Sequence, residues 1–150
     1  MYNKQQYKAY ASATQTVAKT RQIIMLYDAA VRNLQQARDI LQDHGRIEER
    51  YRLLSRANEI IYGLQGCLDF ENGGDVAKVL YDFYSSVDAR ILTLHRNQSL
   101  PVCDQLIRDL KAMRDTWDEI DRAGASDDQA TPAGVVPPAG GGDGGMAISA

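Results

Sequence analysis

The sequence predicts an all-α protein, an antiparallel up-down four-helix bundle with an N-terminal arm and a disordered C-terminal tail. Apolar residues recur every three or four positions over four stretches of about twenty residues each. Short polar or glycine-containing turns separate these stretches, and none shows the two-residue alternation that is typical of a strand. We therefore expect an arm over residues 1–17, a bundle over 18–122 and a tail over 123–150.

The N-terminal arm fits no core pattern. It carries Tyr2, Tyr7 and Tyr10 among lysines and glutamines. Tyrosine rings can dock on an apolar surface while their hydroxyls stay in contact with water. A frayed terminus explains the same composition equally well. The sequence leaves both interpretations open.

The first two bundle helices are predicted from about Val17 to Asp43 and from about Arg46 to Asp69. The first has its apolar stripe at Ile24, Tyr27, Val31, Leu34 and Leu41, and the second at Ile47, Tyr51, Leu54, Ile61, Leu64 and Leu68. His44-Gly45 separates them as a helix end, and the glutamates that follow suit the first turn of a new helix.

The third helix is predicted from Asp75 to about Arg96 and the fourth from Pro101 to about Arg122. Before the third helix, Gly73 suits the left-handed residue that closes a helix, and Asp75 suits the following N-cap. Proline is tolerated in the first turn of the fourth helix because its missing N–H would have no helical partner there. The polar residues 97–99 form the turn between the two helices.

The tail differs from the bundle in composition. Residues 123–150 include no aromatic and no basic residue, and ten of these 28 residues are Gly or Pro. Such a segment buries too little apolar surface to offset its ordering entropy. We expect it to be disordered.

Charge and hydropathy exclude several functions. The net charge of −3 comes from three aspartates in the tail, so that residues 1–122 are formally neutral. A neutral body does not attract nucleic acid over long range, and no apolar run is long enough for membrane insertion. With no secretory signal at the N-terminus, we expect a cytoplasmic protein with two reduced thiols. Cys67 and Cys103 flank core positions, and we expect both thiols to be buried in the core as packing residues without metal or redox chemistry.

The residues needed for catalysis or for a metal centre are missing. A di-iron bundle needs Glu-x-x-His pairs, but Leu41 and Leu92 lie three residues before His44 and His95. The serines on predicted helices have no evident base. We expect no cofactor and no enzyme. One alternative remains from another functional class: a histidine phosphotransfer module that uses His95.

The apolar stripes are wider than a coiled-coil seam requires. Helices of globular bundles often bury such a broad face. The other interpretation is that part of the surface stays open as apolar grooves for amphipathic helices of a partner.

Several motifs identify a family when taken together. Their order is Met1-Tyr2 with Lys8-Ala9-Tyr10-Ala11, then Met25-Leu26-Tyr27-Asp28-Ala29-Ala30, then Leu68-Asp69, Glu71, Gly73-Gly74, Val76-Ala77, Leu80 and Tyr81-Asp82-Phe83-Tyr84, and finally Trp117. This ordered set resembles the flagellar secretion chaperones of the FliS type. Two departures stand out: Val17-Ala18-Lys19 replaces the usual alanine-serine-proline, and Ala29 replaces a common glycine.

The resemblance implies a cytosolic export chaperone. It would bind the disordered C-terminal segment of flagellin in apolar grooves, prevent premature polymerisation and deliver flagellin to the flagellar type III export apparatus. Implied partners are flagellin and a membrane protein of the export gate, and the free protein is either a monomer or a homodimer. We expect flagellin at Ile23, Leu26 and Tyr27, and secondarily at Tyr81 and Tyr84. A plain core role stays open for each of these residues, and it is the favoured interpretation for Tyr27. In this family the N-terminal arm is thought to move when flagellin binds and to contribute to the contact with the export gate. Carried over to this sequence, the resemblance implies that Tyr7 and Tyr10 make this contact.

Overall fold

The computed structural model describes residues 4–13 and 20–143; the side chains of Lys4, Tyr7, Ala11 and residues 125–143 lie outside the description. Its elements are α1 (Lys4–Ser12), α2 (Thr20–Asp39), a 3-10 turn (His44–Arg46), α3 (Ile47–Gly66), α4 (Phe70–Asn97) and α5 (Leu100–Asp143). The described residues contain no strand. The predicted all-α class is therefore confirmed.

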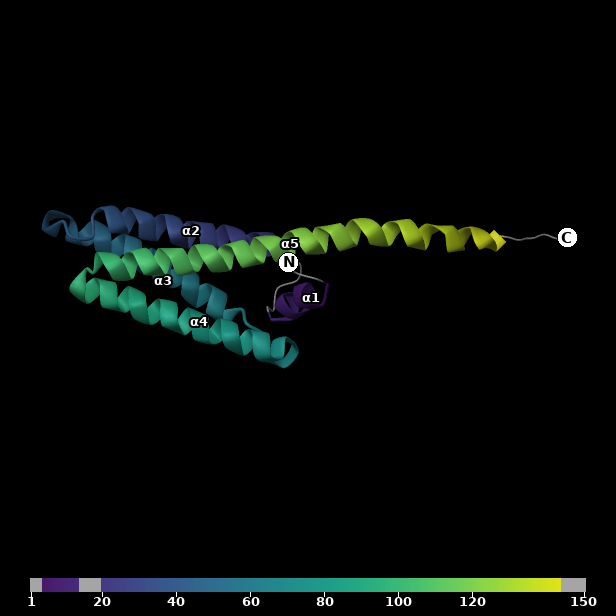
Figure 1. Ribbon diagram of the computed structural model, residues 1–150, viewed down its shortest axis with the longest axis horizontal. Coiled ribbons are helices and arrows are strands. Elements are labelled where there is room, and N and C mark those ends of the chain that lie inside the picture. The colour runs from purple at the N-terminus through teal and green to yellow at the C-terminus, as the bar shows by residue number, and fades with distance from the viewer. Residues whose placement is uncertain (1–3, 14–19, 144–150) are drawn as a thin grey trace.

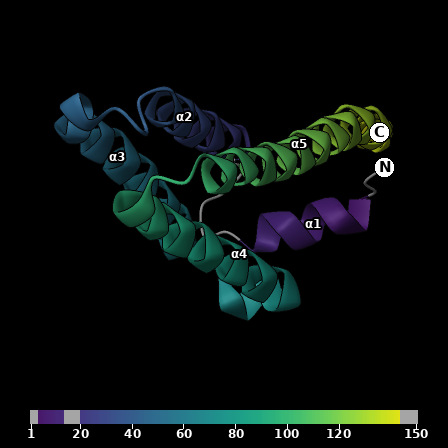
Figure 2. The same cartoon turned by 60° about the vertical axis from the view of Figure 1, so that its left-hand side comes forward.

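Helices α2 to α5 form the bundle (Figure 1). Helix α2 packs against both α3 and α5, and α3 packs against α4. Helices α4 and α5 diverge from the turn that connects them, and α1 lies between their far ends (Figure 2). The structure thus has the docked form of the N-terminal arm.

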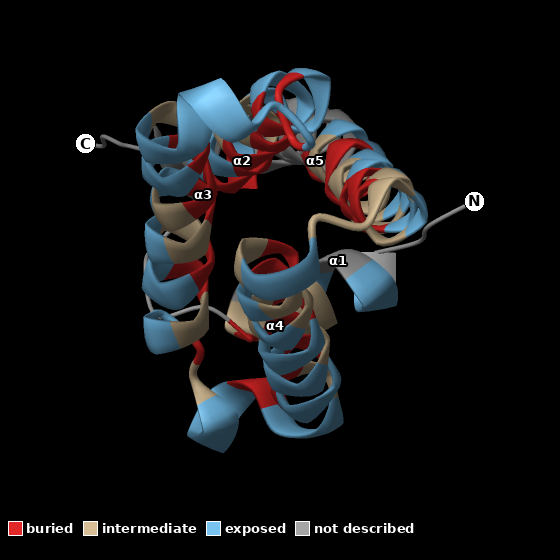
Figure 3. Cartoon of the chain, turned by 90° about the vertical axis from the view of Figure 1, so that its left-hand side faces the viewer, coloured by how far each residue is buried: buried red, intermediate tan, exposed pale blue. Residues whose placement is uncertain are grey.

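The core follows the predicted stripes. Buried residues face inward on all four bundle helices (Figure 3). Fully buried aliphatic side chains include Ile24, Leu34, Leu54, Ile61, Leu80, Ile91 and Leu106. Each contributes about 1.5–3 kcal/mol by leaving water, so apolar burial is the main term that holds these amphipathic helices together.

Side-chain caps and one left-handed residue form the two outer turns. Between α2 and α3, Asp43 Oδ1 accepts the Gly45 N–H at 2.9 Å. Between α4 and α5, Gln98 has φ 46° and donates its N–H to the Leu94 carbonyl at 3.3 Å. Ser99 Oγ then accepts the Val102 N–H in the first turn of α5. Both turns lie where the sequence predicted them.

The central turn differs from its prediction. Gly74, with φ 53°, is the left-handed residue, whereas Gly73 is helical and buried. Asp69 is the N-cap of α4, since its carboxylate accepts the Asn72 N–H at 3.0 Å. The third bundle helix therefore begins at Phe70 and continues through a kink at Gly74, so it does not begin at Asp75.

Helix α5 continues beyond the predicted end near Arg122. Its backbone is helical as far as Asp143 and extends past the bundle (Figure 1). Residues 144–150 lie outside the description, and the disorder predicted for 123–150 stays a prediction. Among the described residues, no helix is both long enough and apolar enough to cross a membrane.

Candidate functional site

The site lies where the N-terminal arm packs on the bundle. The ring of Tyr10 meets Trp117 of α5 edge-on, with centroids 5.1 Å apart and planes at 88°. Just after the end of α1, the Ala13 carbonyl accepts the Asp69 N–H at 2.8 Å, and Ala13 is fully buried. An aromatic contact and a backbone hydrogen bond therefore hold the arm at two points.

Gly73 permits the close approach of the arm to α4. A Cβ at this position would lie 2.5 Å from the Cα of Ala13 and 2.9 Å from the Cβ of Ala77. Real Cβ atoms do not come so close to a backbone atom. The contact is therefore specific for small residues on both sides, and this requirement explains the first glycine of the pair.

Two hydroxyls lie under the arm in the core. Tyr27 Oη donates to Tyr84 Oη at 2.9 Å, and both residues are almost fully buried. Burial raises the pKa of both tyrosines, and nearby Tyr10 adds to this rise. Trp117 Nε1 is also buried and has no hydrogen-bond partner within the described residues. We call Tyr27, Asp69, Gly73, Tyr84 and Trp117 the arm seat.

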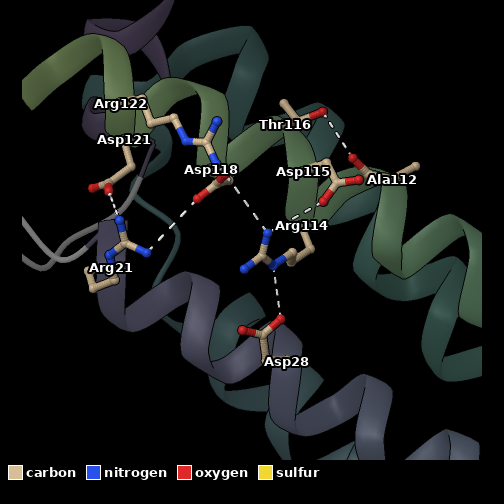
Figure 4. Close-up of polar contacts among 9 residues, drawn as sticks. All are labelled: Arg21, Asp28, Ala112, Arg114, Asp115, Thr116, Asp118, Asp121 and Arg122. Atoms are coloured by element: carbon tan, nitrogen blue, oxygen red, sulfur yellow. Dashed lines mark hydrogen bonds and ion pairs between the residues drawn. The ribbon is translucent and has the colours of Figure 1, made fainter. Parts of the chain in front are cut away.

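An ion-pair network fixes α2 to α5 beside the arm seat (Figure 4). Arg114 Nε is 2.9 Å from Asp28 Oδ1, and Arg114 also lies within 4.0 Å of Asp118. Asp118 is buried and takes a further contact from Arg122 at 2.7 Å. Asp28 and Asp118 directly follow the seat residues Tyr27 and Trp117 in the chain, so Arg114 ties together the two stretches that carry these rings.

The predicted flagellin-binding residues divide into two groups. Ile23, Tyr27 and Tyr84 are buried, with exposed fractions of 6%, 0% and 1%, whereas Leu26 and Tyr81 are 41% and 45% exposed. The hydrogen bond between their hydroxyls brings Tyr27 and Tyr84 together in the seat, and Tyr10 lies near both. The Tyr7 side chain lies outside the described residues.

Sequence reasoning missed two parts of the site. It used Trp117 as a motif of the family resemblance without predicting its contact with the arm, and it did not foresee that Gly73 meets the arm. The glycine pair itself was the signal for the contact at Gly73. A turn needs only one left-handed residue, so the other glycine must have another reason. The interpretation of Cys67 as buried filler was wrong, since this thiol is exposed. Cys103 is buried, and burial raises its pKa to about 11.

The second candidate chemistry is phosphotransfer by His95. The His95 ring lies 5.2 Å from the ring of Tyr51, and burial together with Arg50 lowers the pKa of His95. Within the described part of the chain, no three His, Cys, Asp or Glu side chains gather to hold a metal ion.

Comparisons with known proteins point to one family. The family model described as "Flagellar protein FliS" matches residues 1–124. A flagellar secretion chaperone FliS of Salmonella typhimurium is 30% identical over 126 residues, 80% of this chain and 93% of that protein. The corresponding Vibrio cholerae chaperone is 30% identical over 64% of this chain and 70% of its own length. FliSB of Pseudomonas aeruginosa is 30% identical over 67% of this chain and 79% of its own.

The fold and the arm seat define a small helical bundle on which the chain's own N-terminal helix α1 packs between α4 and α5. With the family model matching the whole bundle and the arm, the chain belongs to the FliS family of flagellar proteins.

Proposed function

We propose that this protein is an export chaperone for flagellin in the bacterial cytosol. It binds the disordered C-terminal segment of flagellin, prevents premature filament polymerisation and delivers flagellin to the type III export apparatus. One observation supports this most directly: α1, a nine-residue helical segment, sits on an apolar site between α4 and α5. A site that accepts this segment has the chemistry to accept a client's helix in its place.

The arm seat suits a client that must later be released. Ordering the disordered client segment on binding uses part of the interaction free energy. A large apolar contact therefore gives only moderate affinity. The docked arm adds a second cost, because it has to leave before the seat can be filled. Both terms favour release at the export machinery.

The exposed and the buried site residues have different places in this proposal. Leu26 and Tyr81 are the exposed anchors for the client. Ile23, Tyr27 and Tyr84 are buried, and the two tyrosines become accessible when α1 leaves the seat. The displaced arm then presents Tyr7 and Tyr10 to a membrane protein of the export gate.

Isothermal titration calorimetry with a peptide of the flagellin C-terminal segment tests the proposal. We expect binding with a large negative heat-capacity change, which reports apolar burial. Leu26→Ser and Tyr81→Ser should each weaken binding about tenfold, with an unchanged Tm because both side chains are exposed in the free protein. Absence of binding by the wild-type chain would refute the proposal, and labelling of His95 by a phosphodonor kinase would favour the phosphotransfer module instead.

A further inference from the structure

Trp117 carries an unused hydrogen-bond donor in the arm seat. Its side chain is 1% exposed, and its indole Nε1 has no hydrogen-bond partner among the residues that the structure describes. A buried N–H without an acceptor is costly, and folded proteins almost always supply one from the chain or from ordered water. The groups around this atom therefore indicate what binds there.

The Tyr27–Tyr84 pair adds a second unused donor. Tyr27 Oη donates to Tyr84 Oη at 2.9 Å, and this bond uses one of the two hydroxyl protons. The proton of the accepting hydroxyl, that of Tyr84, needs an acceptor of its own. Within the described part of the chain it has none. Two donors, one indole N–H and one O–H, are thus left over inside an apolar core.

These donors lie close together. Burial raises the pKa of Tyr27 and the Trp117 side chain counteracts part of this rise, which places the indole N–H near the Tyr27 hydroxyl. The two groups nevertheless do not meet in the geometry of a hydrogen bond. Even a direct bond between them would serve only the indole and would leave the Tyr84 proton without an acceptor.

The chemistry of the site selects a small neutral acceptor. Two spare donors disfavour a cation, and an anion would exchange its hydration for uncharged groups only. A water molecule meets the requirement, because its oxygen accepts from both donors and one of its protons returns to a lone pair of Tyr27 Oη. Three hydrogen bonds are the usual number for a buried water.

We propose that the arm seat binds one structural water molecule, which accepts from Trp117 Nε1 and Tyr84 Oη and donates to Tyr27 Oη. This inference concerns the free protein and stands apart from the proposed function. It assigns a ligand to the indole donor and gives the buried tyrosine pair a third polar partner.

Helix α1 closes this water site. The ring of Tyr10 packs edge-on against Trp117, and Tyr10 also lies near both tyrosines of the pair. The water therefore exchanges with bulk solvent only when α1 leaves the space between α4 and α5. Docking of the arm and enclosure of the water are one event.

A high-resolution crystal structure of the full chain tests the site. We expect α1 in its seat and oxygen density within about 3.2 Å of Trp117 Nε1 and of both hydroxyls. The double variant Tyr27→Phe with Tyr84→Phe leaves only one polar partner where a water needs at least two, so the density should vanish. Tyr81→Phe removes an exposed hydroxyl from the same helix and should keep it. Wild-type density that shows no oxygen between the three groups would overturn the proposal.

Nuclear magnetic resonance tests the enclosure in solution. Trp117 is the only tryptophan, so its indole N–H gives a single signal. In wild type we expect a nuclear Overhauser effect from long-lived water to this proton and slow exchange in D2O. Gly73→Ala and Tyr10→Ser each loosen the arm and should speed this exchange about tenfold or more, whereas Gly63→Ala should not. Equal exchange rates in all four proteins would show that α1 does not enclose the water. No flagellin is present in either experiment, so both outcomes are independent of the proposed function.

Discussion

At the scale of single residues, the Tyr27–Tyr84 pair places two hydroxyls inside an apolar core. Each satisfies the other through one hydrogen bond of 2.9 Å. Tyr84→Phe leaves the Tyr27 hydroxyl buried without its acceptor, and we expect a loss of about 1–3 kcal/mol in the free energy of unfolding. Replacing both by Phe should cost less than the sum of the single changes. Urea unfolding of the four proteins measures this, and strict additivity would show that the two hydroxyls do not interact.

Asp88, unlike the two tyrosines, carries a charge, and burial disfavours that charge. Its pKa of about 6 in the folded protein lies above the ordinary value of 3.8. Between these two pH values the folded state binds a proton that the unfolded state has lost. The contribution of Asp88 to stability therefore falls as pH rises through this window and stays low above it.

The comparison with Asp88→Asn isolates this effect. The variant should match the wild-type free energy of unfolding near pH 4 and become more stable as pH rises to about 6, with a constant advantage above. Because solvent reaches the carboxylate, we expect less than about 1 kcal/mol. Asp69, Asp104 and Asp109 have lowered pKa values and change stability in the opposite sense, but both proteins contain them. A stability difference independent of pH, measured by urea unfolding from pH 4 to 7, would contradict the assignment.

At the scale of elements, local pattern determined most of the helices but not the central turn. Apolar spacing alone locates α2, α3 and the C-terminal end of α4 to within about four residues, since each helix buries one continuous stripe, whereas α4 begins five residues before its predicted start. Gly73 and Gly74 look alike in the sequence, and either could be left-handed. A tertiary contact decides between them, because Gly73 has to let Ala13 approach.

The candidate site was only partly predictable for the same reason. Tyr27 and Tyr84 lie on core stripes, and spacing cannot separate a core residue from the floor of a docking site. Whether the arm docks depends on the space between α4 and α5, and no local sequence pattern reports the size of that space. The exposure of Leu26 and Tyr81 likewise follows from how the helices are rotated in the bundle.

Gly73→Ala tests the contact between arm and bundle. Alanine favours a helix over glycine by about 0.5–1 kcal/mol, but here the new Cβ collides with the backbone of Ala13. We therefore expect α1 to leave its seat while the bundle stays folded. The fluorescence of Trp117, the only tryptophan, should shift to the red, and amide exchange in α1 should become fast.

Gly63→Ala is the matched control for this change. Gly63 is also a helical glycine, and a Cβ there would have no neighbour within 4 Å. It should raise the free energy of unfolding by up to about 1 kcal/mol and leave the Trp117 spectrum unchanged. If Gly73→Ala behaves in the same way, the close approach of the arm does not hold.

At the scale of the whole molecule, the chain's own helix α1 completes the packing between α4 and α5. Three neighbouring helix pairs pack closely, while α4 and α5 diverge and α1 lies between them (Figure 2). The formally neutral bundle gives no long-range steering, so apolar contact has to select the partner. Under the proposed function, arm and client compete for one seat.

Competition has a measurable consequence for affinity. If the seat is free in only a fraction of molecules, the apparent Kd of the client is the intrinsic Kd divided by that fraction. Tyr10→Ser weakens the arm by removing its contact with Trp117 and leaves the seat itself unchanged. It should therefore tighten binding of the flagellin peptide, by about tenfold if the lost contact is worth about 1.4 kcal/mol.

The same variant separates binding from delivery. Because the displaced arm is proposed to contact the export gate, cells that carry Tyr10→Ser should hold flagellin tightly and yet secrete less of it. Calorimetry and an assay of secreted flagellin measure the two effects, and Lys8→Ser serves as the control on the same arm because its side chain is exposed. Weaker flagellin binding by Tyr10→Ser would mean that the arm belongs to the client interface, and the competition model would then be wrong.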